Sequence, residues 1–170
     1  MVRAFAGGLL AGFGHNPIFA VRDYTGELRF APGSPADALL KLDVHADSLA
    51  VQNDVSDKDR QDIERAMKEE VLEVSRFPEI AFESKKVSGV QLDETLYTMN
   101  VEGDLTLHGV TRRQAFSAQV VPANDALRAY GEGTLRQSDF NIKLVSVAGG
   151  TLKVKDELKL SFDFVARKQG

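Results

Sequence analysis

The chain has 170 residues, a formal net charge of −4 and no cysteine. The missing cysteines exclude a disulfide framework, a thiolate nucleophile and a cysteine-ligated zinc site. The negative charge disfavours nucleic acid and anionic membrane surfaces as partners, because both require clustered lysine and arginine. A chain of this length buries roughly 70% of its unfolded surface, so we expect a single domain over residues 1–170 with a sizeable core.

The first residues carry only weak features of a targeting segment. Arg3 precedes a short apolar run, but the glycines inside that run make a poor signal-peptide core. We therefore expect a cytoplasmic protein, or a periplasmic one if the natural N-terminus is longer. The sequence contains no apolar run of about 18 residues, so we expect no integral membrane segment.

Alternation of apolar and polar residues is the dominant pattern of the chain. Within residues 96–107, Tyr97, Met99 and Val101 share one parity while mainly polar residues occupy the other, and residues 158–167 repeat the pattern. This period of two is typical of long strands with one dry and one wet face. In chain order, the predicted strands are 2–5, 18–23, 27–30, 38–45, 79–87, 96–107, 114–121, 127–135, 140–147 and 151–166, with a turn at Thr25–Gly26.

One segment departs from this pattern and predicts a helix between Ser56 and Ser75. Ser56 is a good N-cap, acidic residues follow it in the first turns, and Phe77–Pro78 is expected to end the helix. An apolar stripe at helical spacing must pack on the sheet or plug a barrel; it consists of Ile63, Met67, Val71 and Val74. Long strands in a short chain must also hide their edges, so we predict an all-β fold, a closed antiparallel barrel with one inserted α-helix.

Motifs for catalysis or metal binding are weak. The glycine-rich start contains neither a P-loop nor a dinucleotide-binding fingerprint, and no serine lies in a nucleophile elbow. The histidines His15, His45 and His108 are scattered without a metal-binding spacing, so we expect no metal and no cofactor. His45 lies on a polar parity. His15 and His108 each border a glycine and a strand end, where a turn, ligand or metal role stays open.

Phenylalanines from different strands gather on the dry parities. They are Phe19, Phe82, Phe116, Phe140, Phe162 and Phe164. An eight-stranded barrel has an interior that side chains can just fill or that can hold one ligand. Periodicity alone does not separate a filled core from a binding cavity. Two glycines on the inward parity, Gly131 and Gly133, indicate strong curvature or the close approach of another group.

Four long strings, in this order, resemble the YceI-like family of lipocalin-like proteins that bind polyisoprenoids or other long lipids. They are GHNPIFAVRDYTGELRF, DRQDIERAMKEEVLEVSRFPEIAFES, GDLTLHGVTR and LRQSDFNIKLVSVAGGTLKVKDELKLSFDFVAR. The resemblance implies a barrel of about eight strands, with an apolar tunnel for an isoprenoid tail and a headgroup near its mouth. The chain starts later than family members usually do, so we expect a short first strand and one open barrel edge. Asn141 stands where the family often has glycine.

We therefore predict a non-enzymatic protein that transports or sequesters a long-chain isoprenoid or other lipid, as a monomer or homodimer. The headgroup candidates at the rim are His15 and Arg136. The predicted apolar lining consists of Phe19, Leu42, Val44, Phe82, Met99, Val101, Phe116, Phe140, Leu160 and Phe162. Two alternatives stay open. One is a small-molecule enzyme or stress-response factor that uses a cavity histidine, and the other is a filled barrel that binds a protein partner.

Overall fold

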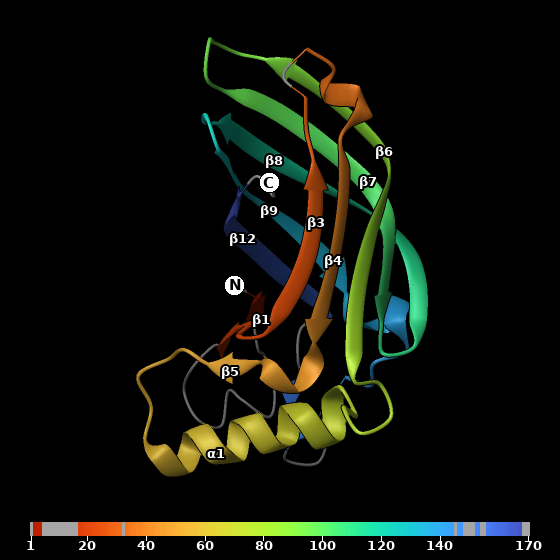
Figure 1. Cartoon of the computed structure of the whole chain (residues 1–170). Coiled ribbons are helices and arrows are strands. Elements are labelled where there is room, and N and C mark those ends of the chain that lie inside the picture. Colours follow the sequence, from red (N-terminus) through yellow and green to blue (C-terminus); the bar gives the residue numbers. More distant parts are fainter. Residues whose placement is uncertain are drawn as a thin grey trace.

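The computed structural model describes residues 2–4, 17–31, 33–144, 146–147, 152–153 and 156–167. The described chain is one strongly curled antiparallel sheet, a half-barrel, with a helix across one end (Figure 1). The strands follow the spatial order β3-β4-β6-β7-β8-β9-β12-β1-β2-β5. Their bounds are β1 Val2–Ala4, β2 Ile18–Ala20, β3 Tyr24–Arg29, β4 Leu39–His45, β5 Ala50–Val51, β6 Glu79–Gln91, β7 Tyr97–Leu107, β8 Val110–Pro122, β9 Ala126–Arg136 and β12 Glu157–Arg167; β10 Ser146–Val147 and β11 Leu152–Lys153 pair separately. The predicted all-β fold with one helix is confirmed.

The wall of the half-barrel is a series of long antiparallel neighbours from β6 to β12. In β7, buried residues alternate with half-buried or exposed ones along the whole strand, as the sequence pattern predicts. The β7–β8 hairpin turns through only His108 and Gly109, whose φ angles are +51° and +71°. Positive φ at both central residues matches the twist of the flanking strands in a tight hairpin. The turn therefore fixes the register of the two strands.

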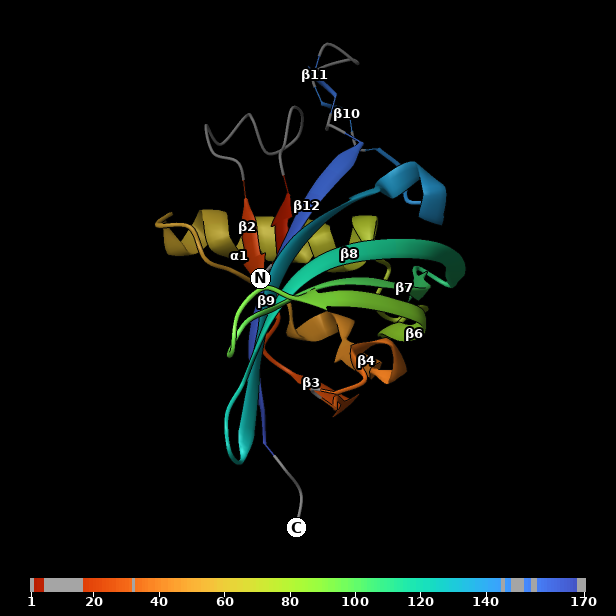
Figure 2. The same ribbon diagram turned by 90° about the horizontal axis from the view of Figure 1, so that it is seen from above.

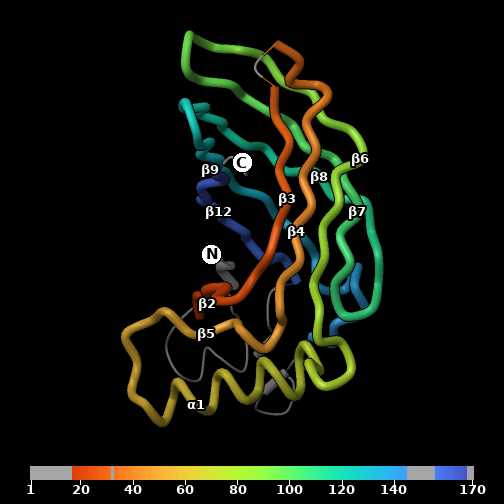
Figure 3. The backbone as a smooth tube through the Cα atoms, in the orientation of Figure 1, coloured from red at the N-terminus to blue at the C-terminus, as the bar shows by residue number. Residues whose placement is uncertain are grey.

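The predicted closure of the barrel is wrong for the described residues, because the sheet does not form a complete ring of hydrogen-bonded strands there. The chain bends between β2 and β3, which follow one continuous path, and it bends again between β4 and β5, which follow another (Figure 3). As a result β3 pairs with β4, whereas β2 pairs with β1 and β5. Among the described residues, β12 pairs with β1 on its side facing away from β9 over Leu158–Leu160. Seen from above, the sheet has a C-shaped section that is open between β3 and β12 (Figure 2).

The helix α1 spans Asp57–Ala66 and continues as a π-helical turn over Met67–Val71. Its start agrees with the prediction, because the Ser56 hydroxyl accepts a 3.1 Å hydrogen bond from the Asp59 amide. Its end comes earlier than predicted. The Leu72 amide donates to the Met67 carbonyl at 2.9 Å, and Glu73 then adopts a left-handed φ of +46°. The helical segment thus ends before Phe77–Pro78 is reached.

Side chains of α1 bind the backbone of the edge strand β5. The Val51 amide donates to Glu64 Oε1 at 2.8 Å, and Arg60 Nη1 donates to the Val51 carbonyl at 2.6 Å. These two bonds satisfy polar groups that an edge strand otherwise exposes. Beneath them, Ile63 and Met67 pack against a buried cluster of Phe19, Val44, Leu49 and Val51. The helix is therefore fixed to the sheet by polar and apolar contacts together.

Two local predictions are wrong. Thr25 and Gly26, predicted as a turn, lie inside β3 opposite Asp43 and Leu42. The predicted strand at Phe140 begins instead with a 3₁₀ helix over Gln137–Phe140. Alternating burial of Phe140 and Ile142 mimics a strand, but Asn141 between them has a φ of +56°. This left-handed angle accounts for glycine at the same position in the family pattern, since asparagine and glycine tolerate it best.

Candidate functional site

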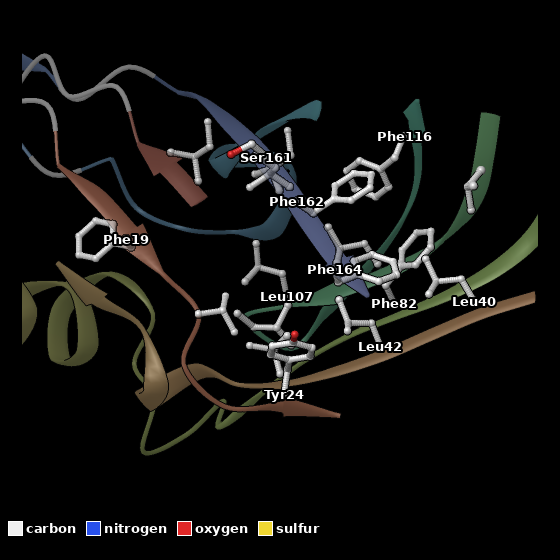
Figure 4. Close-up of a pocket in the computed structure, with 18 of the residues that line it drawn as sticks. Phe19, Tyr24, Leu40, Leu42, Phe82, Leu107, Phe116, Ser161, Phe162 and Phe164 are labelled. Atoms are coloured by element: carbon white, nitrogen blue, oxygen red, sulfur yellow. The ribbon is translucent and has the colours of Figure 1, made fainter. Parts of the chain in front are cut away.

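The concave face of the sheet and α1 enclose a cavity of about 480 Å³. This volume falls within the roughly 300–1,000 Å³ of typical small-molecule sites. Its wall is almost wholly aliphatic and aromatic, and its polar members are Tyr24, Gln137, Ser161 and Asp163. Figure 4 shows aromatic rings from β6, β8 and β12 meeting aliphatic side chains of β4 inside it. Such a surface suits an apolar guest.

Most of the side chains predicted to line a tunnel do lie in this wall. They are Phe19, Leu42, Val44, Phe82, Met99, Val101, Phe116, Leu160 and Phe162. The prediction that Phe140 lines the cavity is wrong. It is 0% exposed and lies in the core at the 3₁₀ helix, so it is absent from the cavity wall. That a ligand contacts the nine others stays a prediction.

Aromatic rings lie directly over glycines of neighbouring strands. A Cβ atom on Gly133 would lie 2.8 Å from Phe116 Cε1, one on Gly103 2.6 Å from Phe82 Cζ, and one on Gly131 2.7 Å from Phe162 Cζ. The predicted close approach at Gly131 and Gly133 is therefore confirmed. Phe82 and Phe116 also contact each other edge to face, with centroids 5.3 Å apart. The glycines let these rings lie near the sheet and leave space inside the half-barrel.

The cavity reaches the surface along the gap between β3 and β12. Tyr24, at the start of β3, is 51% exposed and still contributes to the cavity wall. Asp163 lies on the opposite side of the gap, and Arg128 Nη2 donates to its Oδ2 at 2.6 Å. The hydrogen bond from Arg128 holds the pKa of the Asp163 carboxyl below its ordinary value. The opening is thus a lateral slit with an aromatic hydroxyl on one side and an ion pair on the other.

Different side chains lie at the two ends of the cavity. At one end Phe30 contacts Tyr97 edge to face, with centroids 5.2 Å apart. At the other end Ile63 and Met67 of the helical segment are 3% and 7% exposed, although both line the cavity. Solvent is therefore excluded from the helix side. Across the slit, Tyr24 faces Phe162 and Phe164 (Figure 4).

Of the two predicted rim residues, only Arg136 belongs to the described part of the chain, and it is not at the slit. Arg136 is exposed at the end of β9 and does not line the cavity, because its neighbour Leu135 takes the inward parity. His15 lies outside the described residues. Tyr24 was missed because the segment beside it reads as a turn. Leu105 and Leu107 also line the cavity but were not among the predicted lining residues. They share the parity of Met99 and Val101 in the same strand, and this shared parity is enough to predict them.

His108 is bound on both ring nitrogens and does not line the cavity. Its Nδ1 lies 3.2 Å from the Phe140 carbonyl oxygen and its Nε2 lies 2.8 Å from Glu73 Oε2. Its ring also packs on Phe77, with centroids 4.4 Å apart. The geometry therefore gives His108 a structural role at the hairpin turn. His45 is exposed, and its Nε2 lies 3.9 Å from Asp23 Oδ2.

The described part of the chain contains neither a metal-binding cluster nor a membrane-spanning helix. No three histidine or acidic side chains there lie close enough together to hold a metal ion. No helix there is long and apolar enough to cross a membrane.

The architecture is an antiparallel half-barrel with an apolar cavity, a lateral opening and a helix across one end. The sequence matches the YceI-like domain over residues 10–166, and the chain belongs to the YceI-like family. It is 28% identical over 153 residues to a UPF0312 protein of Pseudomonas savastanoi, an alignment that covers 86% of this chain and 72% of the relative.

Solved structures share the fold at low sequence identity. Burkholderia cenocepacia BcnA superposes with a TM-score of 0.73 at 20% identity, covering 97% of this chain and 94% of the other. A polyisoprenoid binding domain from Saccharophagus degradans, described as implicated in plant cell wall breakdown, superposes with a TM-score of 0.57 at 9% identity. That alignment covers 86% of this chain and 92% of the other. At these identities the likeness concerns the fold alone.

Proposed function

We propose that this protein binds a long apolar amphiphile of the polyisoprenoid type and carries or sequesters it without chemical change. The observation that carries the proposal is the cavity, whose wall is apolar except for four residues. Burying an apolar tail there gains roughly 0.8 kcal/mol per CH₂. The printed name of the Saccharophagus degradans domain supports the isoprenoid class for the tail.

The headgroup lies at the slit in this proposal. Tyr24 and Asp163 both line the cavity, and both are exposed to solvent in part. A lipid whose tail fills the cavity can keep its polar end there in contact with water, which avoids the cost of burying an unpaired polar group. Arg136 has no part in this arrangement.

A carrier is favoured over an enzyme by the position of His108. A general acid or base must reach the proton that it transfers, within hydrogen-bond distance of a bound substrate. His108 lies outside the cavity wall and both of its ring nitrogens already face acceptors. The cytoplasmic location and the monomeric or homodimeric state stay predictions from the sequence.

Mass spectrometry of solvent extracts tests the proposal. The protein is purified from its native host under non-denaturing conditions, and the extracted lipids are compared with those from a sample of Phe116→Trp purified in parallel. We expect an isoprenoid lipid at near-stoichiometric amount with the wild type and a depleted amount with the variant. Equal lipid in both samples, or none in the wild type together with no uptake of added polyprenol, would overturn the proposal.

A further inference from the structure

On the helix side the cavity ends at Ile63 and Met67, which we call the floor of the cavity. This floor limits how far a tail can extend. α1 crosses the lower end of the half-barrel in Figure 1, and Ile63 and Met67 lie between its axis and the cavity. Both side chains are nearly inaccessible to solvent, so the cavity ends against them and does not continue past the helix. A tail end that reaches this side must stop there.

The floor is held at a fixed depth. Arg60 and Glu64, in the same turns of α1 as Ile63, bind the backbone carbonyl and amide of Val51 in β5. A helix anchored in this way cannot follow a change of side-chain volume freely. Removing atoms from a well-packed buried position leaves most of the space empty, because the surroundings relax only in part. A smaller side chain at Ile63 or Met67 therefore deepens the cavity.

The π-helical turn that ends the helical segment brings further side chains to this side of the cavity. It begins at Met67, where the Leu72 amide bonds to the Met67 carbonyl five residues back. Met67, Val71 and Leu72 all line the cavity. Methionine at the end of the cavity is flexible and polarisable, so it adapts to the shape of a tail end.

We infer that Ile63 and Met67 set the length of the apolar tail that this protein accepts. This inference rests on the proposed function and adds a specificity to it. Every further CH₂ that finds room tightens binding by up to about fourfold, while one that meets the floor gains nothing and strains the fit. The affinity then rises with tail length to an optimum, and the two floor side chains fix where that optimum lies.

Linear all-trans prenols of increasing length test the inference. Their dissociation constants are measured by competition with a fluorescent apolar probe, for the wild type, Met67→Ala, Ile63→Val and Met67→Trp. We expect the optimum to move to a longer prenol in Met67→Ala, with a gain of about tenfold for the next isoprene unit if roughly two of its carbons enter the space that is freed. Ile63→Val should give a smaller gain in the same direction, and it is the milder change if Met67→Ala unfolds. Met67→Trp should move the optimum to a shorter prenol.

Two controls separate a floor from general loosening. Val51→Ala removes apolar packing from the same cluster, but Val51 does not line the cavity, so the optimum should stay unchanged. Ala118→Leu adds volume to the cavity wall on β8, away from α1, and should weaken all long prenols without the same shift of the optimum. Unchanged optima in folded Met67 and Ile63 variants overturn the inference, as does an equal shift in Val51→Ala. Absence of prenol binding by the wild type contradicts the proposed function itself.

Discussion

The imidazole Nε2 of His108 donates a 2.8 Å hydrogen bond to Glu73 Oε2 and so joins the β7–β8 hairpin to the end of the helical segment. The other ring nitrogen, Nδ1, faces the Phe140 carbonyl at 3.2 Å. The carbonyl belongs to the 3₁₀ helix over Gln137–Phe140, and the carboxylate belongs to Glu73, which follows the helical segment and its last turn. One side chain in a tight turn thus connects three elements around the closed end of the half-barrel.

Replacing His108 with asparagine should test this connection without breaking the turn. Asparagine followed by glycine is strongly preferred in a hairpin turn with two positive φ angles, so the β7–β8 register should persist. The loss of both ring hydrogen bonds should lower the free energy of unfolding by about 1–3 kcal/mol. Urea denaturation measures it. The exposed His45→Asn variant is the control and should change the stability little; equal losses in both variants would contradict the structural role of His108.

Stability should depend on pH through Glu73. Hydrogen bonds from Arg76 and then from His108 lower the pKa of this carboxyl below its ordinary value of 4.5. The folded state therefore binds the proton less readily than the unfolded state. The contribution of Glu73 is present above pH 4.5 and is lost as the pH falls through the lowered pKa.

The pH prediction is tested by comparing the wild type with Glu73→Gln in urea across this range. The wild type should be the more stable protein at neutral pH, and the difference should shrink as the solution is acidified. Because Asp156 and Asp163 also have lowered pKa values, only the difference between the two proteins isolates Glu73. A constant difference at all pH values would exclude this role of the carboxylate.

The parts of the fold that depend on local pattern could be predicted from the sequence. Alternation of apolar residues predicted β7, and Ser56 with the acidic residues after it predicted the start of α1. The slit could not be predicted, because it results from pairing between segments far apart in the chain. Tyr24 lies at the slit because β3 is at the end of the strand order, and the sequence around Tyr24 does not indicate which strand takes that place. Phe140 was misassigned because a 3₁₀ helix followed by a left-handed residue produces the same alternate burial as a strand.

Adding a methyl group at Gly133 should disturb both stability and the cavity. The new Cβ would overlap the ring of Phe116, which would have to move toward the cavity. Overpacking of this kind costs about 1–3 kcal/mol. We expect Gly133→Ala to lower the free energy of unfolding by such an amount and to weaken prenol binding. Gly33→Ala is the matched control, because a Cβ there meets no atom within 4 Å. Equal behaviour of the two variants in urea would refute the close approach.

A larger ring at Phe116 should separate a binding cavity from a filled core. Phe116 lines the cavity wall beside Phe82, so the extra volume of Phe116→Trp has empty space to enter. If the cavity holds a tail, the variant should fold with near-normal stability and bind prenols at least about tenfold more weakly, the equivalent of losing roughly two buried CH₂ groups. If the interior were filled, the same change would instead cost about 1–3 kcal/mol of stability. Val165→Trp, on the exposed face of β12, controls for the indole itself and should leave both quantities unchanged. Prenol titration and urea denaturation of the three proteins decide the matter, and undiminished uptake in a folded Phe116→Trp variant would count against a tail in this cavity.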